Sequence, residues 1–154
     1  MTEQPYYMIV VFVNNPKKGQ VMVLKKHLHI SIKRRFSLKE ISEDQMIKEI
    51  GDIIFDFKNK KLMLGQISEF SNGQKYYSIQ PRITVSQIHK KLINKLNKFA
   101  NTKDKRWEDE NFIPHLAIYD FNKVKYPIFI KIDYLFLIKE IDAENDKWKI
   151  IEKI

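Results

Sequence analysis

Two short segments of this sequence each place a histidine two positions before a small residue. They are Leu28–Ile32, which contains His29 and Ser31, and Pro114–Ile118, which contains His115 and Ala117. In both segments apolar residues alternate with polar or small ones, the pattern of a β-strand with one buried face. The histidine and the small residue therefore leave the same face of the strand, about 7 Å apart. This spacing suits a phosphate group, because the small residue can lie beside it while the imidazole reaches an ester oxygen.

Two histidines are sufficient to cleave a phosphodiester bond without a metal ion. One group must take a proton from the attacking hydroxyl, and another must give a proton to the leaving oxygen. Imidazole titrates near neutral pH, so His29 and His115 can fill these two roles. A single histidine on a strand is usually structural or exposed. The repeated pattern favours a functional role for the pair.

Composition limits the class of protein. A chain of 154 residues fits one domain, 1–154, or two closely joined lobes that share a core, and its 44% hydrophobic and 31% charged residues are typical of a globular protein. The absence of cysteine excludes disulfides, thiolate metal sites and cysteine nucleophiles. The net charge of +9 favours phosphate-bearing partners, although a lysine-rich composition can also reflect an AT-rich genome. No apolar run approaches the length of a membrane span, so we expect no membrane association and a cytoplasmic location. We also expect a monomer.

Hydrophobic periodicity predicts two helices among many strands. The first helix begins at a capping box, Ser42–Gln45, and ends at Gly51, and the second begins at a capping box, Thr84–Gln87, and continues to Phe99. The expected strands span 6–13, 27–33, 53–57, 61–70, 75–80, 112–119, 127–140 (one long strand or two joined ones) and 148–154. Each half of the chain thus supplies one helix, several strands and one histidine-bearing strand. This order predicts an α+β fold of two pseudo-symmetric lobes, with antiparallel sheets flanked by helices around a central cleft.

With these elements in place, the sequence resembles the 2H phosphoesterase superfamily, specifically its RNA 2′,3′-cyclic phosphodiesterase and 2′-5′ RNA ligase branch. The mark of that family is two His-x-Thr/Ser motifs flanked by apolar residues. The separation of the two histidines, the capped helix after the first, the meander, the long helix before the second and the downstream segment Ile132–Glu140 are also similar to the family. So is the lead-in to the second motif, Phe112-x-Pro114-His115. The resemblance covers nearly the whole chain.

The resemblance implies that His29 and His115 are the acid and the base, and that Ser31 hydrogen-bonds a nonbridging phosphate oxygen. It implies an RNA or nucleotide phosphate substrate, and neither a metal nor a cofactor. The implied enzyme is a 2H-type cyclic phosphodiesterase, or 2′-5′ RNA ligase-like hydrolase, with two sheet-and-helix lobes around a cleft.

The sequence departs from the family pattern at two positions. Ala117 stands where the family has a second Thr or Ser, and Asp120 stands where many members have an arginine. A missing hydroxyl donor to a charged oxygen costs about 1.5 to 3 kcal/mol, or roughly ten- to hundredfold in rate. We expect another side chain near the phosphate to compensate, and the candidates are Arg34, Arg35, Lys33 and Tyr119.

Several alternatives are left open by the sequence. His27 precedes His29 by two positions, and a His-x-His pair with a third histidine could bind a metal, although no carboxylate stands at a recognisable ligand spacing. His89 is expected on the solvated face of the second helix. The substrate could be a small cyclic nucleotide or a nucleotide-sugar phosphate instead of RNA. The chain could also be a binding module that has lost catalysis but still holds RNA ends.

Overall fold

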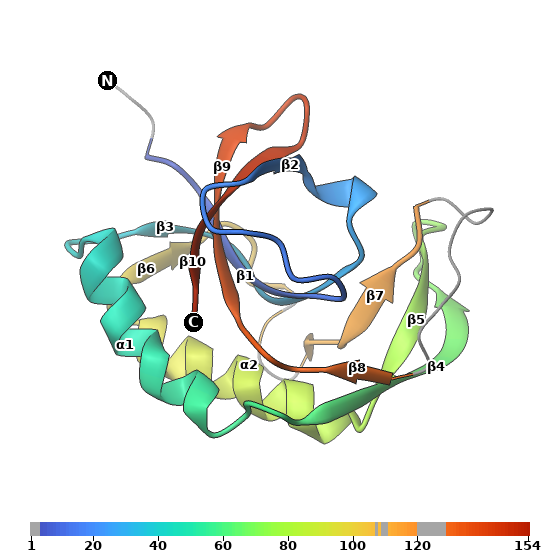
Figure 1. Ribbon diagram of the computed structural model, residues 1–154. Coiled ribbons are helices and arrows are strands. Elements are labelled where there is room, and N and C mark those ends of the chain that lie inside the picture. Colours follow the sequence, from blue (N-terminus) through green and yellow to red (C-terminus); the bar gives the residue numbers. More distant parts are fainter. Residues whose placement is uncertain (1–3, 107, 109–110, 120–128) are drawn as a thin grey trace.

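The computed structural model describes residues 4–106, 108, 111–119 and 129–154, in which two α-helices pack against a large antiparallel sheet (Figure 1). The helices are α1 (Glu43–Phe55) and α2 (Arg82–Leu96), and a short 3₁₀ helix spans Leu24–Lys26. The strands are β1 (Tyr7–Phe12), β2 (Val21–Val23), β3 (His29–Leu38), β4 (Lys61–Glu69), β5 (Lys75–Gln80), β6 (Ala100–Thr102), β7 (His115–Ala117), β8 (Phe129–Lys131), β9 (Phe136–Asp142) and β10 (Lys147–Lys153).

Within the described residues the strands form a single sheet. Their order is β2-β10-β9-β1-β3-β7-β5-β4-β8, with β6 beside β3. The pair formed by β3 and β7, which carry the two histidine motifs, therefore lies inside the sheet and joins strands from the two halves of the chain. The α+β class and the antiparallel pairing are as predicted. The pseudo-symmetric division of residues 1–154 into two lobes stays a prediction.

The core lies on both faces of the sheet. Ile30, Ile32 and Leu116 contribute to a large apolar cluster that also contains the buried faces of α1 and α2. A smaller cluster on the opposite face contains Phe136 and Trp148. All of β1 is buried, with alternate residues in the two clusters, which explains why its sequence is an unbroken apolar run.

Helix α1 begins as predicted but does not end at Gly51. The hydroxyl of Ser42 accepts a hydrogen bond from the backbone N–H of Gln45 at 3.2 Å, and the Gln45 side chain accepts one from Ser42 N–H at 3.0 Å. The helix then continues to Phe55, so the strand predicted at 53–57 is wrong. Ile53 and Ile54 are buried on the same stripe as earlier apolar residues of the helix. Their burial outweighs the cost of about 1 kcal/mol for a glycine in a helix.

Helix α2 begins earlier than predicted, and it buries a side chain, His89, that was expected to be exposed. It starts at Arg82 after Pro81 instead of at the predicted Thr84 capping box, and it ends at Leu96. His89 is 2% exposed, so its predicted place on the solvated face is wrong. The reason is that α2 contacts two elements at once: the His89 Nδ1–H donates to the Ile32 carbonyl at 2.6 Å, and the ring stacks on Phe112 at a centroid distance of 3.8 Å.

Most strand predictions are confirmed, with changed ends. β1, β4, β5 and β10 lie where strands were expected, and the predicted strand at 127–140 is interrupted, with β8 and β9 inside or overlapping its range. The second histidine strand is confined to His115–Ala117, and residues 120–128 lie outside the described part of the chain. Two short strands, β2 and β6, were not predicted, because three residues carry too little periodicity to identify them.

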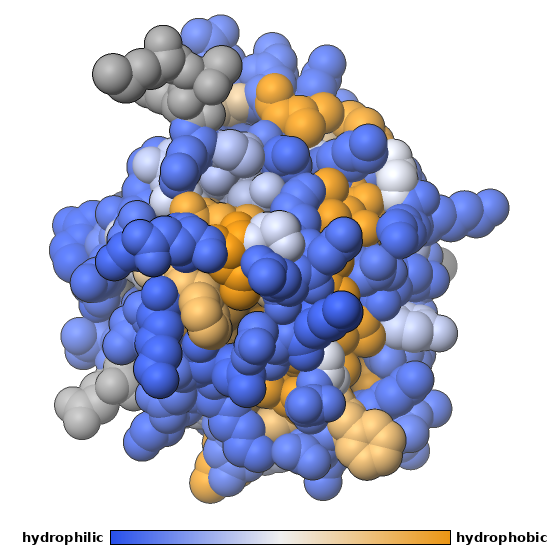
Figure 2. Space-filling view, turned by 90° about the vertical axis from the view of Figure 1, so that its left-hand side faces the viewer, coloured by the Kyte–Doolittle hydropathy of each residue, from blue (hydrophilic) through white to orange (hydrophobic). Residues whose placement is uncertain are grey.

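The face of the protein in Figure 2 is mostly hydrophilic. On the face in Figure 2, polar and charged side chains cover most of the area, and hydrophobic side chains show in patches between them. Among the described residues, no helix is long and apolar enough to cross a membrane.

Candidate active site

The pairing of β3 with β7 brings the two histidine motifs together. Ile30 pairs with Leu116 in this antiparallel pair. That register sets His29 opposite Ala117 and Ser31 opposite His115, all on the face away from the core residues Ile30 and Leu116. The two histidines are therefore diagonal neighbours, whose backbones are about 7 to 8 Å apart in such a pair. This separation leaves room for a phosphate between the two rings.

Both imidazole rings are held in the same way. Nδ1 of His29 lies 2.7 Å from the carbonyl oxygen of His27, and Nδ1 of His115 lies 2.7 Å from the carbonyl oxygen of Ile113. Because a carbonyl can only accept, we assign the hydrogen to Nδ1 in each ring. In the neutral ring, Nε2 is then the free nitrogen, which can accept a proton, and in the charged ring it can donate one.

The environment of both rings favours the neutral imidazole. Burial lowers the pKa of His29, and the hydrogen bond to the His27 carbonyl opposes this only in part. Burial also lowers the pKa of His115, and the positive charges of Arg34 and His29 lower it further. Each ring is therefore mostly neutral at pH 7 in the free protein. An anionic phosphate between them would raise the pKa of both, because it stabilises the charged form.

One cavity of about 820 Å³ contains both histidines. Its size is within the range of pockets that hold nucleotide-sized ligands. Seven of the eight residues that the sequence predicted for the site line it, all except Lys33: His29, Ser31, Arg34, Arg35, His115, Ala117 and Tyr119. The structure thus brings the predicted residues together, and the roles assigned to them stay predictions.

Two irregularities in β3 decide which basic residues face the cavity. The pairing of β3 with β1 shifts register twice between Ser31 and Phe36, each time with an extra residue on β3. Such bulges interrupt the alternation of side chains and turn a residue toward a site. As a result, Arg34 and Arg35 both line the cavity although they are neighbours in sequence, whereas Lys33 is buried.

The two arginines differ in their partners. Arg35 donates from Nε to Glu140 at 2.9 Å, and its guanidinium lies 5.3 Å from the ring centroid of Trp148. Within the described chain, Arg34 makes no hydrogen bond or ion pair. Arg34 is therefore the better candidate of the two for a phosphate oxygen.

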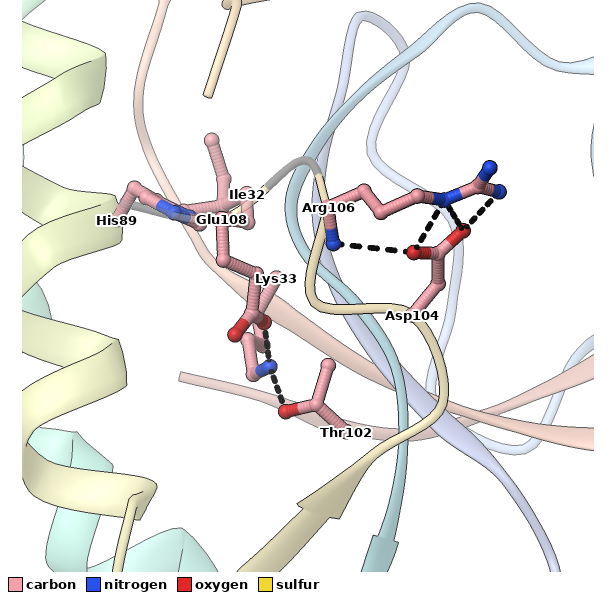
Figure 3. Close-up of polar contacts among 7 residues, drawn as sticks. All are labelled: Ile32, Lys33, His89, Thr102, Asp104, Arg106 and Glu108. Carbon is pink, nitrogen blue, oxygen red and sulfur yellow. Dashed lines mark hydrogen bonds and ion pairs between the residues drawn. The ribbon is translucent and has the colours of Figure 1, made fainter. Parts of the chain in front are cut away.

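The proposed role of Lys33 as a phosphate ligand is wrong. Its side chain is 2% exposed, and its ammonium group contacts the carboxylate of Glu108 and, at 2.7 Å, the hydroxyl of Thr102 (Figure 3). These groups line a different cavity from the two histidines. Tyr119 is exposed and lines the histidine cavity, whereas Asp120 lies outside the described residues.

Sequence reasoning missed other residues that line the cavity, among them Asp146. Asp146 lies in the turn between β9 and β10, and its carboxylate accepts hydrogen bonds from the backbone N–H of Lys25 at 2.8 Å and from Trp148 Nε1 at 3.0 Å. It thereby fixes the segment before His29. No local pattern marks this role, because Lys25 and Asp146 lie at opposite ends of the chain.

The second side of His115 is aromatic. Phe70 and Tyr76 stack on each other at a centroid distance of 4.1 Å, and both contact the His115 ring edge-on, at 5.0 and 5.5 Å. Phe70 also lines a smaller cavity of about 250 Å³, which shares Arg34 and His115 with the larger one. The catalytic candidate His115 thus stands between two adjoining cavities.

The metal-binding alternative of the sequence finds no support in the arrangement of the side chains. His27 is exposed after the 3₁₀ helix and does not line the histidine cavity. Across the described ranges, no three His, Cys, Asp or Glu side chains are grouped so that they could hold a metal ion.

Comparison with known proteins identifies the fold. The sequence matches no protein-family model and has no significant match among curated proteins. Among solved structures, the chain is similar to Escherichia coli LigT in complex with NADP⁺, with a TM-score of 0.60 and 12% identity over 99% of this chain and 97% of that one. It is also similar to a crystal structure of a phosphoesterase (TM-score 0.58, 12% identity, 99% and 98% covered) and to Escherichia coli LigT with 3′-AMP (TM-score 0.56, 12% identity, 99% and 98% covered). The chain therefore has the fold of these proteins, and the predicted 2H phosphoesterase-like α+β fold is confirmed.

Proposed function

We propose that the protein is a metal-independent 2H-type phosphoesterase that acts on RNA 2′,3′-cyclic phosphate ends or on 2′-5′ phosphodiester linkages. One observation carries the proposal: His29 and His115, 86 positions apart in the sequence, line one cavity with the same ring nitrogen tied to a backbone carbonyl. The fold shared with LigT and a phosphoesterase supports it.

The two rings can complete the opening of a cyclic phosphate. Neutral Nε2 of one histidine takes a proton from a water molecule while the water oxygen forms a bond to phosphorus. Nε2–H of the other, charged histidine gives its proton to the ribose oxygen as the bond from that oxygen to phosphorus breaks. The exchange leaves one phosphate monoester and one hydroxyl, with the proton moved from one ring to the other. Either histidine can start as the base.

The phosphate itself needs donors besides the two histidines. Ser31 lies opposite His115 in the strand pair, and its hydroxyl has no partner among the described residues, whereas the equivalent position opposite His29 is Ala117. Arg34 can supply a positively charged donor in place of the missing hydroxyl, because it lines the cavity and has no acidic partner among the described residues. A charge-assisted hydrogen bond of this kind is about twice as strong as a neutral one.

The decisive assay is incubation of the purified protein, in EDTA, with an RNA oligonucleotide that ends in a 2′,3′-cyclic phosphate. We expect ring opening, with the product scored as a 2′- or a 3′-phosphate. His29→Ala and His115→Ala should each lower kcat by several orders of magnitude while the unfolding midpoint stays near that of the wild type. Full turnover by both variants, or activity that EDTA abolishes and a metal ion restores, would contradict the mechanism.

One observation favours a second function, that of a nucleotide-binding module. The hydroxyl expected opposite His29 is absent because the residue is Ala117. Salt-dependent binding of the same oligonucleotide without any ring opening would favour this function over catalysis.

A further inference from the structure

We propose that Lys103 and Arg106 form a second phosphate subsite beside the histidine pair, so that the preferred substrate carries at least one phosphate besides the one that reacts. The inference rests on the proposed function, and it narrows the substrate to an oligonucleotide, as opposed to a cyclic mononucleotide. Both residues lie on the segment between β6 and β7, outside the two histidine motifs.

The position of these two residues follows from the cavities. Lys103 and Arg106 both line the large cavity that contains His29 and His115. Arg106 also lines the smaller adjoining cavity, together with Arg34 and His115. Arg106 therefore stands at the boundary of the two spaces, where a chain that continues past the reacting phosphate would pass.

The charges on the segment that carries Lys103 and Arg106 favour an anion. The acid that faces the cavity on this segment is Asp104, and it is already paired: Arg106 donates to it from Nε at 3.1 Å and from Nη2 at 2.8 Å. A guanidinium has five N–H donors, so Arg106 keeps the two on Nη1 and one on Nη2 for a ligand. The ammonium of Lys103 lies 4.8 Å from the ring centroid of Tyr6 and has no acidic partner in the described part of the chain. With Arg34, these side chains give this side of the cavity a net positive charge.

The segment is fixed before any ligand arrives. Lys103 donates its backbone N–H to the Arg35 carbonyl at 3.0 Å, which continues the pairing of β6 with β3. Beyond Arg106, the carboxylate of Glu108 contacts the buried ammonium of Lys33 (Figure 3). Between these anchors, Arg106 donates its own N–H to Asp104 at 3.0 Å and so closes a tight turn. Such preorganisation lowers the entropy lost on binding.

The reacting phosphate has other donors in the proposed mechanism. Ser31 and Arg34 accompany the two histidines, whereas Lys103 and Arg106 lie on a different segment. A second phosphate, one nucleotide away along an RNA chain, is the group that these two cations can hold. A cyclic mononucleotide has only its reacting phosphate and cannot use the subsite.

The test compares two substrates: adenosine 2′,3′-cyclic phosphate, which has one phosphate, and a diadenosine that has an internal phosphodiester and ends in a 2′,3′-cyclic phosphate. We expect wild type to have the higher kcat/KM on the dinucleotide. Arg106→Gln and Lys103→Gln should each lower kcat/KM on the dinucleotide about tenfold more than on the mononucleotide. Lys105→Gln is the matched control, because Lys105 is on the same segment but lines the separate cavity of Glu108 and Lys33.

Salt dependence supplies a second readout. For binding to a single strand, the slope of log affinity against log salt concentration falls in magnitude by about 0.7 for each phosphate that the protein no longer neutralises. Arg106→Gln should show this smaller slope with a non-cleaved dinucleotide, and Lys105→Gln should keep the slope of wild type. Equal decreases in kcat/KM on both substrates in Arg106→Gln and Lys103→Gln, or no decrease in either, would overturn the subsite.

Failure of the proposed chemistry is distinguishable from failure of the subsite. If no cyclic phosphate is opened, calorimetry still compares adenosine 3′,5′-bisphosphate with adenosine 3′-monophosphate. The subsite would be supported without catalysis if wild type and Lys105→Gln bind the bisphosphate more tightly than the monophosphate, and Arg106→Gln binds the two with equal affinity. Equal affinity for the two ligands would refute it.

Discussion

Replacing Lys33 with methionine should lower the free energy of unfolding by about 3 kcal/mol, because it leaves the Glu108 carboxylate without its cation. The Glu108 side chain is 12% exposed and the Lys33 side chain 2%, so water screens the pair little. Burial lowers the pKa of Lys33, and the contact with Glu108 does not fully offset this. The lost solvation of the ammonium therefore exceeds what the carboxylate returns. A double variant, Lys33→Met with Glu108→Leu, should return to within about 1 kcal/mol of wild type.

Denaturant unfolding of wild type, both single variants and the double variant measures this directly. In a protein of this size, 3 kcal/mol corresponds to a shift in Tm of roughly 6 to 12 °C. In Glu108→Leu, the buried Lys33 keeps a lowered pKa, so the variant should regain stability relative to wild type as the pH rises from 7 toward about 10 and the ammonium loses its proton. Additive losses in the double variant would refute the reasoning, because they would show that each partner stabilises the fold independently of the other.

Four further predictions concern the site and its supports. The pKa of both His29 and His115 is lowered, so one ring is charged while the other is neutral only at acidic pH. The value of kcat/KM should therefore peak below about pH 6.5 and decline toward pH 8. A peak above pH 7 would contradict the lowered pKa values. Wild type should also lose stability as the pH falls through about 6.5, since the unfolded state then binds more protons, and His29→Ala should lose less over the same range. His89→Phe keeps the stacked ring but removes a buried donor, which should cost about 1 to 3 kcal/mol in urea unfolding; an unchanged midpoint would show that the hydrogen bond to β3 does not stabilise the fold. Gly65→Ala would bring a methyl group into contact with the hydroxyl of Ser78, which pairs with His115 in the sheet. The change should lower the free energy of unfolding by about 1 to 3 kcal/mol, and changing Ser78 to glycine as well should recover part of this loss.

The sequence by itself determined the features that depend on neighbours along the chain. The alternation around His29 and around His115 identified two strands and the faces from which the histidines project. The capping box at Ser42 located the start of α1, as the hydrogen bonds to Gln45 confirm. The apolar run at residues 6–13 predicted a strand, and the structure has β1 there, buried on both faces. These signals are local, because side-chain direction in a strand and capping in a helix repeat over a few residues.

Only the tertiary structure decided which side chains meet. The pairing of Ile30 with Leu116 sets the two motifs diagonally across one strand pair, and a shift of one residue would have sent one motif to the core. Simple alternation would place Lys33 on the face of His29 and Ser31 and would place Arg34 on the core face, and the bulges in β3 reverse this arrangement. His89 is buried because α2 packs on β3 and on the segment before β7 at once. Register, bulges and the buried face of a helix depend on contacts between segments far apart in sequence, and periodicity along one segment carries no information about the partner it will meet.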